Sequence, residues 1–189
     1  MIRKMYKKDA IRVAGIHQRE LSGFLPELGI EFLQAFYETS LNIPEMFTYI
    51  HLQNEQISGF VSGINTVNGL NKRLISRNPK AFILPLLRFF LTHPMRTVKL
   101  VKTFSYPGFT GDIPELLSIA VDGRWQRRGI GKKLFFTTVD EFKKRGIKKF
   151  RISVYDRLSA NEFYRKIGCR FETSFTFLGE KMNYYLYKI

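Results

Sequence analysis

The chain has 189 residues, of which 44% are hydrophobic and 25% are charged; this size and composition are typical of one folded domain and exclude wholesale disorder. It contains a single cysteine, Cys169, which excludes a disulfide framework or a cysteine metal quartet and favours a reducing compartment. The formal net charge of +15 would attract nucleic acid, anionic lipid or a phosphorylated small molecule, unless much of it is solvated surface.

The N-terminus and the apolar runs carry no predicted targeting or membrane-spanning segment. The first nine residues have no apolar run after their positive charges, so a signal peptide is not expected. The longest apolar stretch, 81–91, is interrupted by Pro85 and Arg88 and is shorter than the roughly 20 residues that span a bilayer. We therefore expect a cytoplasmic protein.

The first third of the chain predicts a strand, two helices and a hairpin. Residues 2–8 alternate weakly as a strand does, and Asp9 is a plausible N-cap for a helix over 10–21. Aromatic and apolar side chains at three- and four-residue spacing predict a second helix over 31–39. Residues 46–52 and 57–67 then predict two strands joined by a tight turn at 54–56.

Residues 70–104 form a basic, apolar insertion that we expect to fold as one or two short helices. The insertion has no acidic residue and eight basic ones, which are Lys72, Arg73, Arg77, Lys80, Arg88, Arg96, Lys99 and Lys102. Such a segment can lie in a membrane interface and attract anionic lipid. The alternative is that its apolar face packs on the core or on a second subunit of a homodimer, with the lysines solvated.

The second half of the chain has a sharper pattern. Residues 116–121 are a nearly continuous apolar run, as expected of a buried strand. A helix over 129–145, a strand over 149–154 and a helix over 159–167 closed by Gly168 follow. Residues 171–178 and 182–189 then predict a closing antiparallel pair around Gly179.

A glycine-containing turn joins the buried strand to the next helix, with the sequence Gln126-Arg127-Arg128-Gly129-Ile130-Gly131 followed by Lys132 and Lys133. Such a turn leaves several backbone N–H groups unpaired at the positive end of a helix dipole, which makes a site for phosphate or pyrophosphate. The turn lacks the Gly-Lys-Ser/Thr of a P-loop and the third glycine of a dinucleotide-binding turn. A basic helix start with glycines for close packing is the structural alternative.

Two motifs resemble those of the GNAT superfamily of N-acetyltransferases. The first is Glu115–Asp122 running into Gln126–Leu134, which is similar to the acetyl-CoA motif Gln/Arg-x-x-Gly-x-Gly/Ala. The second is Asn161 followed by Tyr164 and Gly168, where Cys169 replaces the usual Phe. The resemblance implies a mixed α/β (α+β) fold, in which a largely antiparallel sheet of about seven strands has helices on both faces and a splay between the fourth and fifth strands. It also implies that residues 1–189 are one acyltransferase domain.

The resemblance also implies an activity, a cofactor and residue roles. The activity is transfer of an acetyl group from acetyl-CoA (coenzyme A) to a primary amine by direct attack. The cofactor-binding residues would be Ile119, Ala120, Val121, Gln126, Arg127, Arg128, Gly129, Ile130, Gly131, Lys132 and Asn161. Tyr164 would protonate the departing thiolate, and Glu115 would accept the amine's proton through water. The alternatives are that Tyr164 is a packing residue of its helix and that Glu115 is a solvated carboxylate at the end of its strand.

The acceptor is expected to be a small-molecule amine, and the basic surface favours one that carries phosphate or carboxylate, such as a nucleotide-linked amino sugar. The family's acceptor-binding regions are aromatic-rich in this chain, at Phe32, Phe36, Tyr37, Phe104, Tyr106, Phe109, Phe175, Phe177, Tyr184 and Tyr185. His17, His51 and His93 are scattered, and no metal site is predicted. A non-catalytic acyl-CoA-binding protein and a basic protein that binds nucleic acid or a membrane surface remain the alternatives, although no nucleic-acid-binding motif is present.

Overall fold

The structure of the protein is a computed structural model that describes residues 1–94, 112–177 and 179–189. The strands are β1 (Ile2–Lys4), β2 (Met46–Gln53), β3 (Gln56–Ile64), β4 (Glu115–Val121), β5 (Lys149–Tyr155), β6 (Arg170–Phe177) and β7 (Glu180–Lys188). The helices are α1 (Ala10–Glu20), α2 (Phe24–Glu27), α3 (Ile30–Ser40), α4 (Leu70–Arg77), α5 (Pro79–Thr92), α7 (Ile130–Lys144) and α8 (Ala160–Lys166), with short 3-10 turns η1 (Lys7–Asp9) and η3 (Gly123–Trp125).

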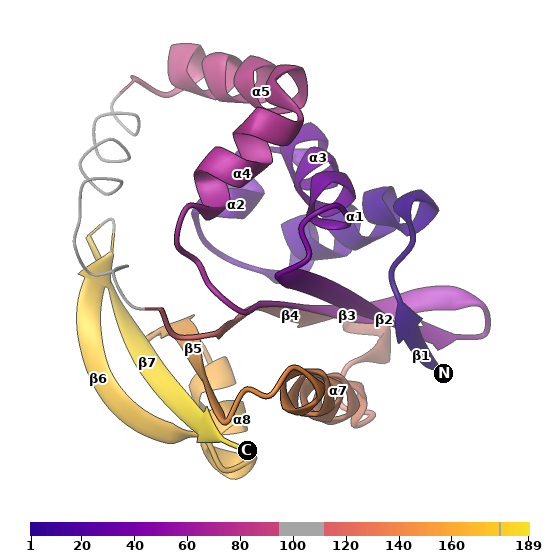
Figure 1. The fold of residues 1–189 in the computed structure, drawn as a ribbon, viewed down its shortest axis with the longest axis vertical. Helices are drawn as coiled ribbons and strands as arrows, with labels where there is room; N and C mark the ends of the chain where they lie inside the picture. The colour runs from indigo at the N-terminus through magenta and orange to yellow at the C-terminus, as the bar shows by residue number, and fades with distance from the viewer. Residues whose placement is uncertain (95–111, 178) are drawn as a thin grey trace.

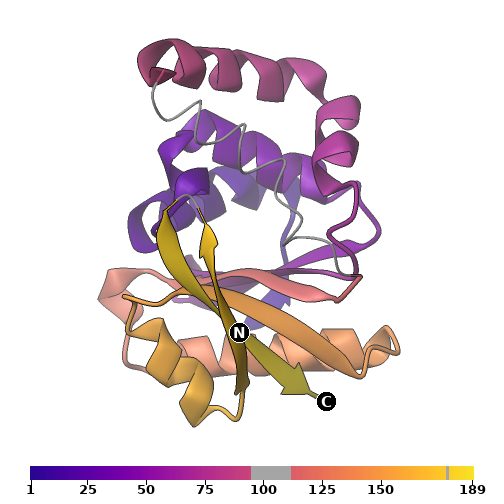
Figure 2. The same cartoon turned by 90° about the vertical axis from the view of Figure 1, so that its left-hand side faces the viewer.

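The strands form one seven-stranded sheet in the order β1-β2-β3-β4-β5-β7-β6. Every neighbouring pair is antiparallel except β4 and β5, which run parallel. Figures 1 and 2 show the sheet crossing the molecule between two layers of helices. The predicted mixed, largely antiparallel sheet of about seven strands is therefore confirmed.

Each face of the sheet has its own apolar core. The helices α1 and α3 cover one face, and α4 and α5 lie on the outside of α3 (Figure 1). The helices α7 and α8 cover the other face, where Phe135, Phe142 and Phe150 are fully buried. Aromatic side chains fill both cores because each buries a large apolar area. The expectation of helices on both faces is confirmed.

The parallel pair β4–β5 opens soon after it begins. Only two positions are paired, Glu115 with Arg151 and Leu116 with Ile152, and the strands then diverge. A bulge in β4 lies at the same place, since Ser118 pairs with Ser62 while Leu116 already pairs with Gly63. A bulge bends a strand and increases its twist, so it helps to turn β4 away from β5. The predicted splay between the fourth and fifth strands is confirmed.

Two details near the N-terminus differ from the sequence-based expectation. The first strand ends at Lys4 because the chain turns into η1. Asp9 was predicted to cap the N-terminus of α1 with its side chain, and this prediction is wrong because the carboxylate bonds to other groups. It accepts hydrogen bonds from Arg3 Nη1 at 2.7 Å and from the N–H of Tyr6 at 2.8 Å. The ion pair draws the carboxylate toward β1, and this fastens the first strand to the start of α1.

The described part of the insertion is helical, as expected. It forms α4 and α5, and Pro85 lies inside α5. Residues 95–104, the rest of the predicted insertion, lie outside the described residues. In the described part of the chain, no helix is long and apolar enough to cross a membrane.

Candidate acetyl-CoA site

The turn before α7 has the backbone shape of an anion site. Arg127 and Gly129 both have positive φ values, 61° and 75°, while the neighbouring helix starts in the ordinary right-handed region. Alternation of left- and right-handed residues points successive N–H groups toward a common concave side. Gly129 suits this position because a glycine adopts a positive φ without strain, and space is open where a side chain would begin.

The N–H groups of Arg127 to Lys132 make no hydrogen bond with any described acceptor; the first bond of α7 runs from the N–H of Lys133 to the carbonyl of Gly129. The first N–H groups of any helix lack intrahelical partners and need an external acceptor. A run of free donors at the positive end of a 15-residue helix therefore fits a pyrophosphate. Lys132 and Lys133 are exposed beside it.

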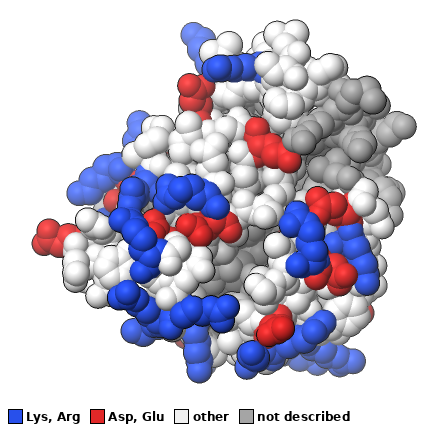
Figure 3. Space-filling view, turned by 180° about the vertical axis from the view of Figure 1, so that it is seen from behind, with Lys and Arg blue, Asp and Glu red and all other residues white. Residues whose placement is uncertain are grey.

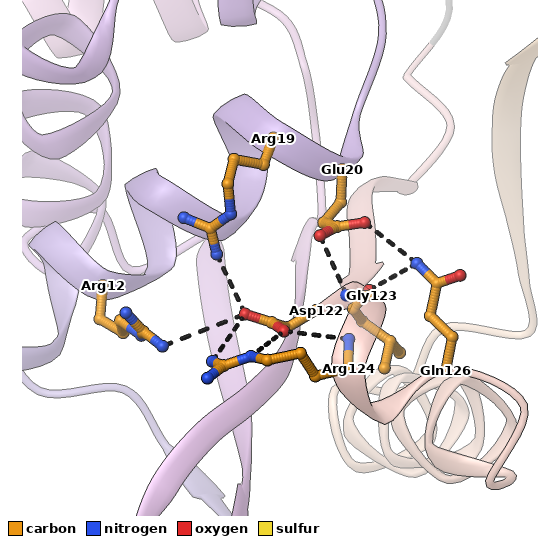
Figure 4. Close-up of polar contacts among 8 residues, drawn as sticks. Arg12, Arg19, Glu20, Asp122, Gly123, Arg124 and Gln126 are labelled. Atoms are coloured by element: carbon orange, nitrogen blue, oxygen red, sulfur yellow. Dashed lines mark hydrogen bonds and ion pairs between the residues drawn. The ribbon is translucent and has the colours of Figure 1, made fainter.

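Hydrogen bonds from Gln126 and to Glu20 hold the beginning of the turn in place (Figure 4). Gln126 donates its side-chain amide to the carbonyl of Val121 at 2.9 Å and to Glu20 at 3.0 Å. Glu20 also accepts the N–H of Gly123 at 3.0 Å. The Gln126 side chain is thus already engaged within the protein, and it links the end of β4 to the C-terminal end of α1. Its predicted cofactor contact remains a prediction.

Asp122 is the centre of an arginine cluster next to this turn (Figure 4). Its buried carboxylate accepts Arg124 Nε at 2.9 Å and Arg19 Nη2 at 3.0 Å, and Arg12 lies 4.0 Å away. The hydrogen bond from Arg124 is the main cause that lowers the pKa of Asp122 to about 2. These residues, with Glu20 and Gly123, line a cleft of about 400 Å³.

The open edge of β4 leads to this turn. Ile119, Ala120 and Val121 pair with β3 on one side only, because β5 has diverged from β4 before it reaches them. A side chain added at Gly131 would meet Phe163 of α8 and Val121 at 3.8–3.9 Å. The start of α7 therefore lies between the end of β4 and α8. Ile130 is buried and anchors the helix in the core below it.

Arg128 and Asn161, two other predicted cofactor residues, are held by contacts within the protein. The guanidinium of Arg128 lies 5.0 Å from the ring of Trp125, a cation–π contact that orients an otherwise exposed side chain. Asn161 is buried, and its amide donates to the carbonyls of Tyr155, Asp156 and Leu158. Its side-chain oxygen accepts from Asn183 and Tyr185, so Asn161 ties the β5–α8 loop to β7.

Tyr164, the predicted proton donor, lies on α8 among aromatic rings. Phe135, Phe163 and Tyr185 have ring centroids 5.3–6.5 Å from its ring. Its hydroxyl forms no hydrogen bond with a described residue. Burial raises the pKa of Tyr164 above its usual value, so the phenol stays protonated at neutral pH. A proton donor needs this protonation state.

Glu115, the predicted base, sits where the β4–β5 pair begins to open. It is buried, and its two oxygens accept Arg151 Nη2 at 2.9 Å and Ser153 Oγ at 2.8 Å. Arg151 also lies over the ring of Tyr184 at 4.5 Å. Sequence analysis did not identify Arg151 as a partner. A basic residue inside the apolar run of β5 was the available signal, because a buried arginine requires an acidic partner.

Several aromatic residues expected near the acceptor belong to the cores instead. Phe32, Phe36 and Tyr37 are buried in the α1–α3 core, and Tyr185 is buried on the other face. Phe104, Tyr106 and Phe109 lie outside the described residues. Phe175 stacks on Tyr184, with ring centroids 4.2 Å apart.

Cys169 is buried, which raises the pKa of its thiol to about 12, as expected of a packing residue. Within the described ranges, no three His, Cys, Asp or Glu side chains gather as a metal site.

Comparison with known protein families agrees with this geometry. The family model described as "Acetyltransferase (GNAT) family" matches residues 13–169. The chain therefore belongs to the GNAT family of acetyltransferases, as the two motifs predicted. The comparison with curated proteins gave no match.

Solved structures share the fold at low sequence identity. The ribosomal-protein-S18-alanine N-acetyltransferase from Escherichia coli is 17% identical, with a TM-score of 0.63 over 100% of this chain and 93% of that chain. A putative GNAT acetyltransferase from Desulfovibrio desulfuricans is 15% identical, with a TM-score of 0.67 over 100% and 98%. A putative acetyltransferase from Salmonella typhimurium, determined with its cofactor acetyl-CoA, is 14% identical, with a TM-score of 0.63 over 100% and 92%. The predicted cofactor, acetyl-CoA, is confirmed for the family.

Proposed function

We propose that this protein, as a single domain, transfers the acetyl group of acetyl-CoA to the primary amine of a small anionic molecule by direct attack. The observation that carries the proposal is the run of free N–H groups from Arg127 to Lys132, next to the open edge of β4. Pyrophosphate and a peptide-like pantetheine arm are the two parts of coenzyme A that such features fit.

The residues present fit the cofactor along its length. The N–H groups of Arg127 to Gly131, with Lys132, would hold the pyrophosphate, and Arg128 would add charge from its place against Trp125. The backbone of Ile119 to Val121 would pair with the amides of the arm. Asn161 would contribute by fixing the loop before α8, because its own polar atoms are occupied. Acetyl-CoA supplies the acetyl group activated as a thioester.

Two side chains would move protons during transfer. Tyr164 holds its proton at neutral pH and would give it to the sulfur as the carbon–sulfur bond breaks. Glu115 would take the proton of the attacking amine through water while the carbon–nitrogen bond forms. Each of its oxygens accepts one hydrogen bond here, and a carboxylate oxygen can accept a second.

The anionic character of the acceptor rests on charge. The net charge is +15, and Figure 3 shows Lys and Arg side chains over much of one face, with fewer Asp and Glu among them. Arg12, Arg19 and Arg124 in the cleft beside the turn are each about half exposed. Such a surface repels polyamines and favours amines that carry phosphate or carboxylate.

An acetylation assay over a panel of amines tests the proposal. Thiol release from acetyl-CoA would be measured with nucleotide-linked amino sugars, neutral amino sugars, polyamines and peptide N-termini. We expect kcat/KM for the anionic amines to exceed that for matched neutral amines at least about tenfold at low salt, and the advantage to shrink as salt screens charge. Equal or better turnover of neutral or cationic amines would contradict the anionic assignment but leave acetyl transfer intact.

The competing function is a non-catalytic acyl-CoA-binding protein. It would bind acetyl-CoA and release no thiol with any amine of the panel. The Tyr164 hydroxyl, which bonds to no described residue, favours catalysis because it is available as a proton donor.

A further inference from the structure

The helix α5 has apolar side chains on two opposite faces. Its inner face packs on the core through Phe82 and Phe89, which are 1% and 4% exposed. Phe82 contacts Phe32 and Phe89 contacts Phe24, with ring centroids 5.3 and 5.7 Å apart. Its outer face carries Ile83, Leu84, Leu87 and Leu91, of which Leu84 and Leu91 are 71% and 83% exposed.

The exposed apolar side chains form one continuous stripe. Residues advance by about 100° along an α-helix, so positions 83, 84, 87 and 91 fall within an arc of about 100°. The centre of that arc lies nearly opposite the direction of Phe82 and Phe89. A helix at the surface of a soluble protein normally places polar side chains there. The inner face of α5 therefore packs on the core, and the outer stripe is available to another partner.

Basic side chains surround this stripe. In residues 70–94 five are basic and none is acidic. Lys72, Arg77, Lys80 and Arg88 are exposed and make no ion pair with a described residue. Arg73 differs, since it lies 3.8 Å from Glu45 and its guanidinium donates to the carbonyl of Thr66. Lys80 lies in line with the stripe and Arg88 about 40° beyond its edge, where long side chains can extend their charge toward a polar boundary.

We propose that the outer face of α5, with the basic residues of α4, binds the surface of an anionic lipid bilayer. Leucines with flanking lysine and arginine are the pattern of helices that lie in the membrane interface. Anionic headgroups complement the charge of the segment. A second copy of the chain would bring two such basic faces together with no acidic residue of 70–94 to offset them, so charge opposes it.

The position of α5 would orient the enzyme on the membrane. The helix α5 lies at one end of the molecule, on the side of the sheet that carries α1 and α3 (Figures 1 and 2). The helix α7, with the acetyl-CoA turn at its start, lies on the other side of the sheet. A bilayer against α5 would thus leave the start of α7 facing the water that supplies acetyl-CoA.

Vesicle flotation of the full chain tests this proposal without any use of acetylation. Vesicles of phosphatidylcholine alone would be compared with vesicles that also contain phosphatidylglycerol. We expect the wild type to float with the anionic vesicles, to float at least about tenfold less with the neutral ones, and to be released by high salt. Leu84→Ser with Leu91→Ser, and separately Lys80→Glu with Arg88→Glu, should each lower partitioning at least about tenfold.

Matched controls separate this face from general stickiness and charge. Ile11→Ser with Leu41→Ser removes exposed apolar side chains elsewhere, and Lys143→Glu with Lys144→Glu reverses charge on α7. Both should leave partitioning within about twofold of the wild type. The proposal is overturned if the wild type does not float with anionic vesicles, or if the α5 variants float as well as the controls. A dimer in solution that only the Leu84→Ser, Leu91→Ser variant dissociates would also overturn it, in favour of a second copy.

Discussion

Tyr164 has surroundings that separate its chemical role from its structural role. The ring is packed among Phe135, Phe163 and Tyr185 in the core, while the hydroxyl bonds to no described residue. Loss of a hydroxyl that has no protein partner leaves no buried donor or acceptor unsatisfied, and such losses cost little stability. An effect of removing this hydroxyl on the reaction can therefore be attributed to chemistry.

Tyr164→Phe is expected to lower kcat about 100-fold or more while leaving the KM for acetyl-CoA within about threefold, because a positioned proton donor accelerates only the step in which the thiolate leaves. The free energy of unfolding should change by less than about 1 kcal/mol. Steady-state kinetics and urea unfolding of the two proteins measure both quantities. A variant with full kcat would remove Tyr164 from the mechanism and leave it as a packing residue.

Much of the site at residue scale could be predicted from the sequence, because it resides in local motifs. The turn Gln126–Gly131 consists of six consecutive residues. Its donors are backbone N–H groups, whose positions can be predicted from the glycines and the start of the helix. The ion pair of Glu115 with Arg151 could not be predicted in this way. Its partners are 36 residues apart and meet only because β4 and β5 pair at their start.

The packing of α1 against α3 contains a buried histidine, His17. Its Nδ1 lies 2.6 Å from the hydroxyl of Tyr37 of α3. The ring of His17 stacks on Phe60 of β3. Burial lowers the pKa of His17 to about 4, so the folded protein holds this histidine neutral. These contacts join α1 and α3 to β3.

Stability should therefore fall with acid in a defined window. The pKa of His17 is about 4 in the folded state, below its ordinary value of 6.5. Below pH 6.5 the histidine is therefore more often protonated in the unfolded chain than in the folded protein. The contribution is complete above pH 6.5 and is lost progressively down to pH 4. Between pH 7 and pH 5 we expect the free energy of unfolding to drop by about 2 kcal/mol from this residue.

Urea unfolding at both pH values, with His17→Gln as the comparison, measures this contribution. The glutamine keeps a polar group near Tyr37 but cannot titrate, so the variant should be less stable at pH 7 and lose less stability between pH 7 and pH 5. Parallel losses in wild type and variant would show that other groups cause the acid sensitivity.

The predictable elements are those whose pattern is set by burial. The continuous apolar run of β4 and the glycine-closed helices α7 and α8 were placed within one or two residues. The predicted role of Asp9 was wrong because its carboxylate can accept either helix N–H groups or Arg3. The tertiary structure places the arginine 2.7 Å away. The two-faced character of α5 also depends on tertiary structure, since only packing shows which apolar side the core uses.

At the scale of the whole molecule, the sheet and its splay organise the parts. The sheet separates two apolar cores, β4 reaches the start of α7 at its end, and the insertion extends the α3 side outward (Figure 1). The positive charge is spread over the surface, so it acts on approaching anions as a field. The pyrophosphate of acetyl-CoA, in contrast, should be bound at one defined place, by the N–H groups at the start of α7.

Calorimetric titration of acetyl-CoA into wild type and Gly131→Glu tests the central claim most directly. The new side chain would start in ordinary contact with Phe163 and Val121, so the fold should survive, and its carboxylate would occupy the free donors and repel phosphate. Thr137→Glu, which adds the same charge two turns along α7, is the control. We expect a Kd on the order of micromolar for wild type and control, and binding at least about 30-fold weaker for Gly131→Glu. Equal affinity in all three proteins would contradict a pyrophosphate site at this turn.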